Sequence, residues 1–402
     1  MKILLISSLF PNAEQPSLGV FVQARLRKLL AAYGDIEVTV VAPIPWFPFK
    51  SDLFGDYAKF ARAPEVEEQY GFTVYHPRYP VIPKVGMSIA PGLMYRSIRK
   101  FVAALHAEKA FDLIDGHYFY PDGVAVSRIA TELGLPFALT ARGTDITLIP
   151  KFEKPRQQIL EAAAKTDVMI SVCQALKDEM VSIGIDGSKI EVLRNGVDLS
   201  FFRPLDASPT VIDVSAMPRI LVSVGYLIER KGHDKTIAAL PDLPDCHLII
   251  AGDGPLLQAL QEQAAELGVS ERVHFVGSQP QEELVRLYNA ADCLVLMSSR
   301  EGMANVLLES LACGTPVVVS QVWGAPEVVK DPVAGRLVKD FEQPTLVSAI
   351  RDLFTNAMTR DAVREYAEQY DWQATSKGQR QLFDKMVTDR RMSMSTTQTS
   401  RA

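Results

Sequence analysis

The chain has 402 residues, of which 48% are hydrophobic and 22% are charged, and its net charge is −6. This length predicts two domains, and the composition excludes a disordered or fibrous chain. The net negative charge argues against a nucleic-acid partner, and no apolar run is long enough to predict a transmembrane helix. The four cysteines lack the paired spacing of metal ligands, so we expect a reduced, cytoplasmic protein without a structural metal.

Short β-rich runs alternate with helical patterns along the whole chain. In the first half the expected strands are 3–7, 37–42, 73–75, 113–115, 137–140, 168–171 and 191–193, separated by helices such as 20–32, 93–106, 123–133 and 175–183. The expected strands of the second half are 220–224, 247–251, 273–276, 294–297 and 317–320. Such alternation indicates βαβ units and parallel sheets, and apolar residues on both strand faces indicate helices on both sides. We therefore predict an α/β protein with two doubly wound domains.

A linker is expected at 201–218, where three X-Pro pairs stand in a stretch with little periodicity. A last helix opens at Asp371 and Trp372, and the polar segment 391–402 after it predicts a disordered tail. Ligands of doubly wound domains bind outside the carboxyl ends of the strands. The loops that follow the expected strands are therefore the places where chemistry is expected.

The most informative of these loops lies at 298–310, between an expected strand and an expected helix. Two carboxylates, Glu301 and Glu309, flank seven residues. A helix that starts near Ala304 would leave Glu301 in the loop and place Glu309 about one and a half turns along. The amides from Gly302 onward would then be donors for an anionic or hydroxyl-rich ligand. Taken alone, the two glutamates are better explained as a solvated loop charge at Glu301 and a helix-surface charge at Glu309.

The wider pattern reads Ser-x-x-Glu-Gly-(x)6-Glu-x-x-Ala-x-Gly-x-Pro-Val-Val and continues to Gly324-Ala325-Pro326-Glu327. This pattern resembles the signature of retaining glycosyltransferase family 4. The resemblance implies the α/β fold named GT-B, in which two Rossmann-like, doubly wound parallel-sheet domains face each other across a cleft. It implies an acceptor-binding domain at 1–203, completed by the last helix over 372–390, and a donor-binding domain at 204–371.

The resemblance also assigns a first set of donor contacts. Glu301 would contact hydroxyls of the donor sugar and Glu309 the ribose of the nucleotide. The amides of Gly302, Met303 and Ala304 would hold the sugar and the phosphates. This sequence departs from the family at Met303, where an aromatic residue is usual.

A second set of donor contacts would come from the neighbouring strand-end turns. Lys231 matches a family lysine that neutralises the diphosphate of the leaving nucleotide. The family's arginine position holds Tyr226, so the adjacent Arg230 would supply the missing charge, unless it belongs to an ordinary exposed basic pair. Further contacts with the nucleotide are expected at Gly225, Gly252, Val276 and Gly277.

On the acceptor side, His117 aligns with the family's strand-end histidine near the reacting sugar. It would position that sugar or polarise the reacting centre, with an ordinary structural histidine as the alternative. Arg142 stands in the histidine position of the family's His-Gly-Thr/Ser-Asp loop. In the same loop Asp145 would contact an acceptor hydroxyl or cap the next turn. Arg194 and Asn195 resemble the family's Pro-Asn-Gly-Val-Asp loop and are also expected near the acceptor.

Two features of the first domain point to an anionic partner. Gly19 opens a helix in a loop that resembles the acceptor-side glycine loop, where an acceptor phosphate would bind. The segment 71–107 holds five cations and no acidic residue, and the segment 46–49 is rich in aromatic residues. Such segments suit contact with anionic lipid at the inner membrane, although a solvated basic face is the alternative.

Together these features predict a retaining hexosyltransferase that acts in bacterial cell-surface polysaccharide synthesis. It would move a sugar from a nucleotide-sugar donor, by default a uridine diphosphate sugar, to a saccharide or lipid-linked acceptor. Glu301, His117 and Lys231 are the expected catalytic residues, and neither a cofactor nor a metal ion is expected. The protein is expected in the cytoplasm, with peripheral contact to the inner membrane. Two alternatives stay open, a GT-B sugar-nucleotide 2-epimerase and a non-catalytic glycosyltransferase-like partner protein.

Overall fold

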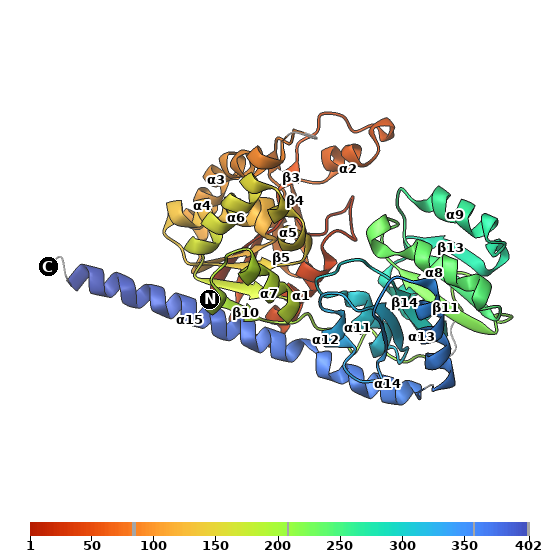
Figure 1. The fold of residues 1–402 in the computed structure, drawn as a ribbon. Helices are drawn as coiled ribbons and strands as arrows, with labels where there is room; N and C mark the ends of the chain where they lie inside the picture. The colour runs from red at the N-terminus through yellow and green to blue at the C-terminus, as the bar shows by residue number, and fades with distance from the viewer. Residues whose placement is uncertain (83–85, 207–208, 357, 400–402) are drawn as a thin grey trace. The chain divides into compact units, whose positions relative to one another are not determined.

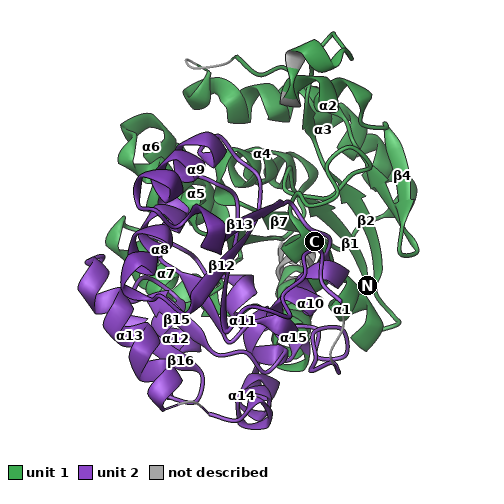
Figure 2. Cartoon of the chain, turned by 90° about the vertical axis from the view of Figure 1, so that its right-hand side faces the viewer, with its two compact units in different colours: residues 1–195, 373–402 green, residues 196–372 purple. Residues whose placement is uncertain are grey.

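The computed structural model describes residues 1–82, 86–206, 209–356 and 358–399. The chain divides into two compact units, one of Met1–Asn195 with Gln373–Ala402 and one of Gly196–Trp372 (Figure 2). Unit 2 therefore begins earlier than the boundary expected after residue 203. The reason is local: the Arg364 guanidinium donates to the carbonyl groups of Leu199 (2.8 Å) and Phe202 (2.7 Å), which fastens part of the expected linker to unit 2.

Unit 1 is built on an eight-stranded sheet of order β10-β9-β8-β7-β1-β2-β5-β4, and β3 pairs with β6 beside it (Figure 1). The large sheet is parallel apart from the pair β4–β5, which is antiparallel. Its central strands are buried on both faces because helices cover both sides. The strands are β1 (Lys2–Ile6), β2 (Glu37–Val41), β3 (Ile44–Pro45), β4 (Val66–Gln69), β5 (Phe72–Tyr75), β6 (Arg78–Tyr79), β7 (Leu113–His117), β8 (Phe137–Ala141), β9 (Val168–Ser171) and β10 (Ile190–Val192).

The helices of unit 1 include the last helix of the chain, α15, drawn in blue in Figure 1. Its side chains Phe383 and Met386 pack against Ile3, Leu29 and Leu113, so the end of the sequence completes the core around its beginning. The helices are α1 (Val20–Ala32), α2 (Asp56–Arg62), α3 (Ala90–Lys109), α4 (Val124–Leu133), α5 (Thr144–Thr147), α6 (Glu153–Lys165), α7 (Gln174–Ser182) and α15 (Trp372–Thr399).

The last helix differs from its sequence prediction at its end. A disordered tail was expected at 391–402, but α15 continues to Thr399, and residues 400–402 lie outside the described residues. The segment 372–399 holds no proline and a single glycine, so nothing in its sequence ends the helix earlier. None of the helices in the described ranges is long and apolar enough to cross a membrane.

Unit 2 is built on a six-stranded parallel sheet of order β13-β12-β11-β14-β15-β16. A large apolar cluster lies between this sheet and helices that include α8, α9 and α13. The strands are β11 (Arg219–Val224), β12 (Cys246–Ala251), β13 (Val273–Gly277), β14 (Cys293–Leu296), β15 (Val317–Ser320) and β16 (Gly335–Val338). The helices are α8 (His233–Ala239), α9 (Leu257–Glu266), α10 (Gln281–Ala290), α11 (Asn305–Ala312), α12 (Ala325–Val328), α13 (Gln343–Thr355) and α14 (Arg360–Ala367).

The strand order reverses beside the first strand of each large sheet. In unit 1, β2 and β7 pair with opposite edges of β1. In unit 2, β12 and β14 pair with opposite edges of β11. Ligands of open α/β sheets bind at such a reversal, outside the carboxyl ends of the strands. The fold therefore directs attention to the loops after β1 and β7 in unit 1 and after β11 and β14 in unit 2.

Candidate active site

Three glycines form the carboxyl edge of β11, β12 and β13 in unit 2. The Gly252 amide donates to the Gly277 carbonyl (2.8 Å), and a Cβ added to Gly252 would lie 1.9 Å from the Gly225 carbonyl oxygen. The turns therefore stack with bare backbone, which only glycine allows at this distance. The structure thus brings Gly225, Gly252 and Gly277, with Val276 beside them, to the same edge of the sheet.

Lys231 and Glu301 meet at the strand reversal of unit 2. Lys231 ends the 3-10 turn η6 (Glu229–Lys231), and its Nζ donates to Glu301 Oε1 at 2.6 Å. Gly225 leaves room for this side chain, since a Cβ there would lie 3.2 Å from Lys231 Cε. The loop after β11 is thus joined to the loop after β14 by a short ion pair.

Two further groups surround the Glu301 carboxylate. Arg230 Nη1 lies 3.2 Å from Glu301 Oε1 and also donates to the Arg300 carbonyl (2.9 Å), while Ser298 Oγ donates to Glu301 at 3.0 Å. Burial alone would raise the pKa of Glu301, but Lys231 and Arg230 outweigh it and hold that pKa below its usual value. The predicted carboxylate and both predicted cations therefore form one charged cluster that keeps Glu301 ionised.

Glu309 lies on α11 in a different electrostatic environment. Its Oε2 accepts a hydrogen bond from the hydroxyl of buried Tyr288 on α10, at 2.9 Å. Burial raises the pKa of Glu309 to about 7, and the Tyr288 hydrogen bond only partly opposes this rise. The two glutamates of the motif therefore differ in charge state near neutral pH, one firmly ionised and the other close to its midpoint.

The loop before α11 carries the predicted backbone donors. Helix α11 begins at Asn305, and the residue before it, Ala304, makes no side-chain hydrogen bond to its first turn. The Gly324 amide donates to the Gly302 carbonyl (3.2 Å), which fixes the loop against the start of α12. The backbone of Gly302, Met303 and Ala304 thus lies just before a helix N-terminus, the kind of place where anions bind.

The departures from the family pattern have distinct local environments. Tyr226, in the arginine position, is 54% exposed, whereas Met303 is buried. Trp323 stands where the family commonly has glycine, and its backbone φ of 49° is in the left-handed region that glycine favours. The chain therefore keeps the glycine-type turn at Trp323 despite the side chain.

In unit 1, His117 ends β7 with both ring nitrogens engaged. Arg142 Nη2 lies 2.5 Å from His117 Nδ1, and His117 Nε2 lies 3.2 Å from Asp115 Oδ2. Because a guanidinium can only donate, Nδ1 is the acceptor and Nε2 carries the proton that it donates to Asp115. Burial lowers the pKa of His117 to about 4, with a further lowering from the Arg142 charge. Both ring nitrogens are thus occupied by protein groups in this structure, and the role of His117 near the reacting sugar stays a prediction.

Arg142 is the partly exposed end of this hydrogen-bonded group. Its Nη1 donates to Asn195 Oδ1 (3.3 Å), and its guanidinium lies 5.2 Å from the centre of the Phe21 ring. Arg194 is half-buried beside Asn195, and its carbonyl accepts from the Thr375 hydroxyl of α15 (2.6 Å). The predicted acceptor residues Arg142 and Asn195 are therefore brought together, with Arg194 next to them in sequence.

Asp145 has a different place from the one predicted for an acceptor contact. It is fully buried, and its carboxylate accepts from the amides of Phe119 (2.8 Å), Gly143 (2.7 Å) and Arg142 (3.1 Å). A carboxylate enclosed by three backbone donors holds a loop and does not reach an acceptor. Asp145 thus resembles the alternative prediction, a local cap, because its oxygens accept hydrogen bonds from nearby backbone amides.

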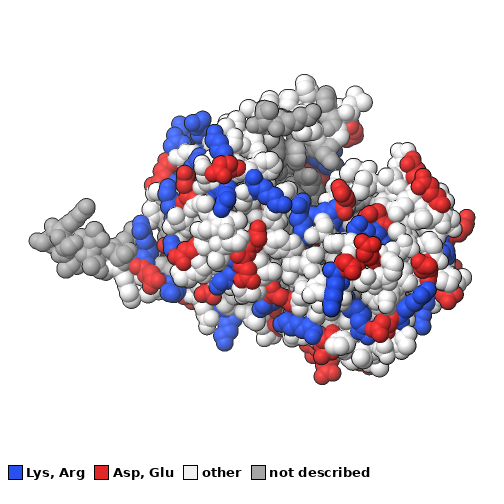
Figure 3. Space-filling view, in the orientation of Figure 1, with Lys and Arg blue, Asp and Glu red and all other residues white. Residues whose placement is uncertain are grey.

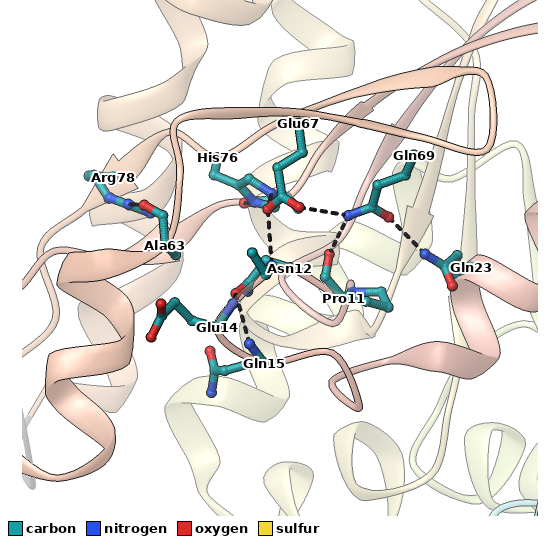
Figure 4. Close-up of polar contacts among 12 residues, drawn as sticks. Pro11, Asn12, Glu14, Gln15, Gln23, Ala63, Glu67, Gln69, His76 and Arg78 are labelled. Atoms are coloured by element: carbon teal, nitrogen blue, oxygen red, sulfur yellow. Dashed lines mark hydrogen bonds and ion pairs between the residues drawn. The ribbon is translucent and has the colours of Figure 1, made fainter. Parts of the chain in front are cut away.

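Gly19 adopts a left-handed turn, with φ of 66°, just before α1. A Cβ there would lie 2.2 Å from the Leu9 carbonyl oxygen, so the glycine allows the loop after β1 to fold back on itself. The β4–β5 hairpin holds this loop from the other side: Gln69 Nε2 donates to the Pro11 carbonyl (3.0 Å), and Gln23 Nε2 of α1 donates to Gln69 Oε1 (2.7 Å) (Figure 4). The loop predicted to bind the acceptor is thus held in place by hydrogen bonds that connect it to β4 and α1.

The expected basic surface of unit 1 is less uniform than its sequence indicates. Lys and Arg side chains gather over α3 at the upper left of Figure 3, where Arg96 and Lys100 are exposed. Arg99, however, pairs with Glu132 of α4 (3.1 Å), and Arg78 is half-buried with a hydrogen bond to the Ala63 carbonyl. Lys84 lies outside the described residues. Partners from elsewhere in the fold therefore neutralise or enclose part of this charge.

An aromatic tip, defined here as residues 46–57, stands close by in sequence. Trp46 (58%), Phe49 (54%) and Leu53 (93%) are exposed. The Phe47 ring lies 6.0 Å from that of Phe49 and 5.3 Å from that of Tyr57, centre to centre. Exposed aromatic groups gathered in this way mark an interaction surface more strongly than the basic residues do.

Sequence reasoning missed several residues that hold the predicted ones. Asp115 could have been found, because residues two apart on a strand share a face, and it stands two before His117. Tyr288 had no such signal, since its partner Glu309 lies 21 residues away. Gln379, which donates to Asp115 from α15, lies 264 residues from it. Only the folded chain shows these contacts.

Known protein families match both halves of the chain. The family model described as glycosyl transferases group 1 matches residues 209–370, and the model described as glycosyltransferase family 4 matches residues 20–201. The chain is 30% identical over 336 residues to the glycosyltransferase TuaC of Bacillus subtilis, named for teichuronic acid biosynthesis, and the match covers 81% of this chain and 82% of TuaC. It is 31% identical to the D-inositol 3-phosphate glycosyltransferase of Mycolicibacterium gilvum, over 72% of this chain and 69% of the relative.

Solved structures show the same fold at lower sequence identity. Sucrose-phosphate synthase from Thermosynechococcus elongatus has a TM-score of 0.78 at 20% identity, covering 97% of this chain and all of that one. Anabaena HepE, solved in complex with UDP-glucose, has a TM-score of 0.71 at 20% identity, covering 96% of this chain and all of that one. The α/β class and GT-B fold predicted from the sequence are thereby confirmed. The chain belongs to glycosyltransferase family 4 and is a glycosyltransferase of the GT-B type.

Proposed function

We propose that this glycosyltransferase takes a sugar from a uridine diphosphate sugar and transfers it with retention of anomeric configuration. The observation that carries the proposal is the cluster of Lys231, Arg230 and Glu301 beside bare glycine turns and the start of α11. Cations and helix-end amides suit a diphosphate leaving group, and carboxylates suit sugar hydroxyls. The UDP-glucose complex of the structural neighbour HepE supports the choice of nucleotide.

The chemistry would use unit 2 for the donor. As the bond between sugar and phosphate breaks, negative charge grows on the leaving diphosphate, and Lys231 and Arg230 would stabilise it. The role is proposed for these side chains without a metal ion or cofactor. Glu301 would exchange part of its contact with Lys231 for donor sugar hydroxyls, and Glu309 would accept hydrogen bonds from the ribose. Front-face attack assisted by the leaving phosphate would give retention.

The acceptor would bind to unit 1, and we propose that it is an anionic saccharide or lipid-linked saccharide of the bacterial cell surface. Arg142 supports this choice, because it is a cation held in place by His117 and Asn195 while part of it stays exposed. The names of two relatives, one for teichuronic acid biosynthesis and one for D-inositol 3-phosphate, both contain acidic compounds. These names and the positioned arginine of this chain favour an anionic acceptor.

A donor panel tests the nucleotide and the outcome. UDP and UDP-sugars are expected to raise the melting temperature of the full chain, because a ligand that binds the native state stabilises it. GDP, ADP and TDP serve as matched nucleotides. With an acceptor, NMR of the product is expected to show the anomeric configuration of the donor, and an inverted product would contradict retention. A sugar nucleotide epimerised without any acceptor would contradict the transferase assignment itself.

We further propose peripheral contact of unit 1 with the cytoplasmic face of the inner membrane through the aromatic tip at 46–57. Aromatic side chains favour the bilayer interface, and the exposed cations of α3 favour anionic headgroups. Sedimentation with vesicles of phosphatidylglycerol and phosphatidylcholine, against phosphatidylcholine alone, tests this contact. The triple variant Trp46→Ser, Phe49→Ser and Leu53→Ser is expected to lose vesicle binding. Val181→Ser, an exposed apolar residue on α7, is the control and is expected to keep it.

A further inference from the structure

The helix α15 contributes one polar side chain, Gln379, to a buried hydrogen-bonded group that contains Asp115, the partner of His117. Gln379 Nε2 donates to Asp115 Oδ2 at 3.1 Å, and Gln379 Oε1 accepts from Arg25 Nε at 2.8 Å. All three side chains are almost completely buried. They come from α15, β7 and α1, so this contact joins the end of the sequence to two elements of its first third.

We propose that Gln379 is a positioning residue that fixes the tautomer of His117 and, through it, the place of the Arg142 guanidinium. A carboxamide is neutral and offers both a donor and an acceptor, so Gln379 stands between a cation and an anion and contacts each. Without Gln379, Arg25 would keep only the Leu193 carbonyl (3.3 Å) and would turn toward the Asp115 carboxylate, because a buried guanidinium with few acceptors is costly. A direct pair would take the carboxylate away from His117.

A continuous chain of hydrogen bonds connects Gln379 to Arg142 through Asp115 and His117. Asp115 Oδ2 accepts from Gln379 and also faces the Nε2 of His117 at 3.2 Å, which places the ring proton on Nε2. His117 Nδ1 is then free to accept from Arg142 (2.5 Å). The other tautomer would point an N–H at the Arg142 guanidinium, two donors with no acceptor between them. By holding Asp115 in place, the side chain of Gln379 thus favours the tautomer of His117 that the Arg142 contact requires.

The charged side chains that shift the pKa of His117 most are Asp115, Arg142 and Arg25. Asp115 lies on its own strand, Arg142 follows β8, and Arg25 lies on α1; Asp115 raises the pKa of His117, and the two arginines lower it, while burial has the largest effect. Any change at Gln379 that redirects Arg25 or Asp115 must therefore appear in the titration and tautomer of His117. This inference depends on the proposed function only for the role of Arg142, and its test reads the histidine itself.

The test uses the full chain with ¹⁵N-labelled histidine and long-range ¹H–¹⁵N correlation spectra. The variant His117→Asn assigns the resonance among the six histidines. In the wild type the His117 ring is expected to stay neutral, protonated on Nε2, down to about pH 4. Gln379→Met, similar in size but apolar, is expected to shift the ring to a mixture of tautomers. Gln379→Glu adds an anion and is expected to raise the pKa of His117 by about one unit or more.

Gln381→Met is the matched control, because Gln381 is exposed on the same helix two residues further on. It is expected to leave the His117 spectrum unchanged. If Gln379→Met does not fold, the polar Gln379→Glu variant still reports on the pKa. A wild-type tautomer and pKa in a folded Gln379→Met or Gln379→Glu protein would overturn the proposal, and so would an equal shift in Gln381→Met. UDP affinity, measured in parallel, tests the proposed function separately, since the nucleotide residues all lie in unit 2.

Discussion

Arg142 Nη2 lies 2.5 Å from His117 Nδ1, and this contact joins a buried histidine of unit 1 to a guanidinium. The glycosyltransferase pattern has a histidine where this chain has Arg142, so a group that titrates near neutral pH is replaced by one that stays charged. Burial lowers the pKa of Arg142 only to about 9. The His117–Arg142 pair therefore carries one positive charge, on the arginine, across the physiological range.

Removal of this charge is expected to change the titration of its partner. Arg142→Met should raise the pKa of His117 from its value of about 4, because Arg142 is among the groups that lower it. Arg142→Lys should leave that pKa closer to the wild-type value, since it keeps a cation in the loop. Histidine ¹⁵N titration measures both. UDP affinity should stay within about twofold in both variants, and an unchanged His117 pKa in folded Arg142→Met would refute the coupling.

The donor site predicts a sharp difference between two lysines of unit 2. Lys231→Met should weaken UDP binding about 10- to 100-fold, the range expected for a lost hydrogen bond to a charged group. Lys235, on α8, pairs loosely with Asp234 (3.6 Å), and Lys235→Met should change UDP affinity less than about twofold. Isothermal titration calorimetry with UDP provides the comparison. Equal losses in the two variants would show a general effect of charge instead of a contact with the diphosphate.

The sequence predicts the frame of this molecule well because its signals are local. Long apolar runs such as those of β1, β12 and β15 must be buried, and they appear within a residue or two of the expected places. The strands β4 and β16 escaped prediction, because Val66–Gln69 is mostly polar and Gly335–Val338 is short and interrupted by Arg336. These segments become strands by pairing with β5 and β15, and the sequence does not show which strands will be their neighbours.

For the candidate site, too, the sequence predicts residues in local motifs and misses contacts between distant segments. Glu301, Glu309 and Lys231 were predicted because each stands in a motif of fixed spacing beside a strand end, and the fold brings Lys231 and Glu301 within 2.6 Å of each other. Asp145 was misjudged as an acceptor contact, because a sequence cannot show that three amides enclose its carboxylate. Gln379 was not found, because a contact 264 residues away has no periodicity or motif to announce it.

The raised pKa of Glu309 predicts a pH-dependent affinity for the nucleotide. Burial lifts this pKa to about 7 in the free protein, so the carboxylate is protonated below that pH. Ribose hydroxyls would donate to the ionised form, and UDP binding would therefore release a proton below pH 7. The affinity should be full above pH 7 and fall about tenfold from pH 8 to pH 6, since each unit below the pKa costs a factor of up to ten.

Calorimetry with UDP from pH 5.5 to 8.5 measures this dependence, and Glu309→Gln provides the control. The terminal phosphate of UDP titrates near pH 6 by itself, and this contribution is shared by both proteins. The variant should bind more weakly at pH 8 and retain only the pH dependence of the phosphate. A variant with the same tenfold fall as the wild type would assign the effect to UDP and not to Glu309.

Two glycines of unit 2 allow steric contact to be separated from backbone strain. Gly232 (φ 68°) and Gly268 (φ 67°) have the same left-handed conformation, but a Cβ on Gly232 would lie 2.1 Å from the Met297 carbonyl oxygen, while nothing lies within 4 Å at Gly268. Gly268→Ala should therefore cost about 1 kcal/mol, the price of the left-handed backbone alone. Gly232→Ala should cost at least ~2 kcal/mol more, because the backbone after β14 must move.

Urea unfolding compares the two variants directly, since both residues lie in unit 2 and report on the same part of the chain. Gly232 also follows Lys231, so its displacement should disturb the Lys231–Glu301 pair and weaken UDP binding, whereas Gly268→Ala should bind UDP like the wild type. Equal losses of stability would mean that the loop after β14 yields easily to the new methyl group. The close packing of Gly232 against Met297 would then not be what positions Lys231.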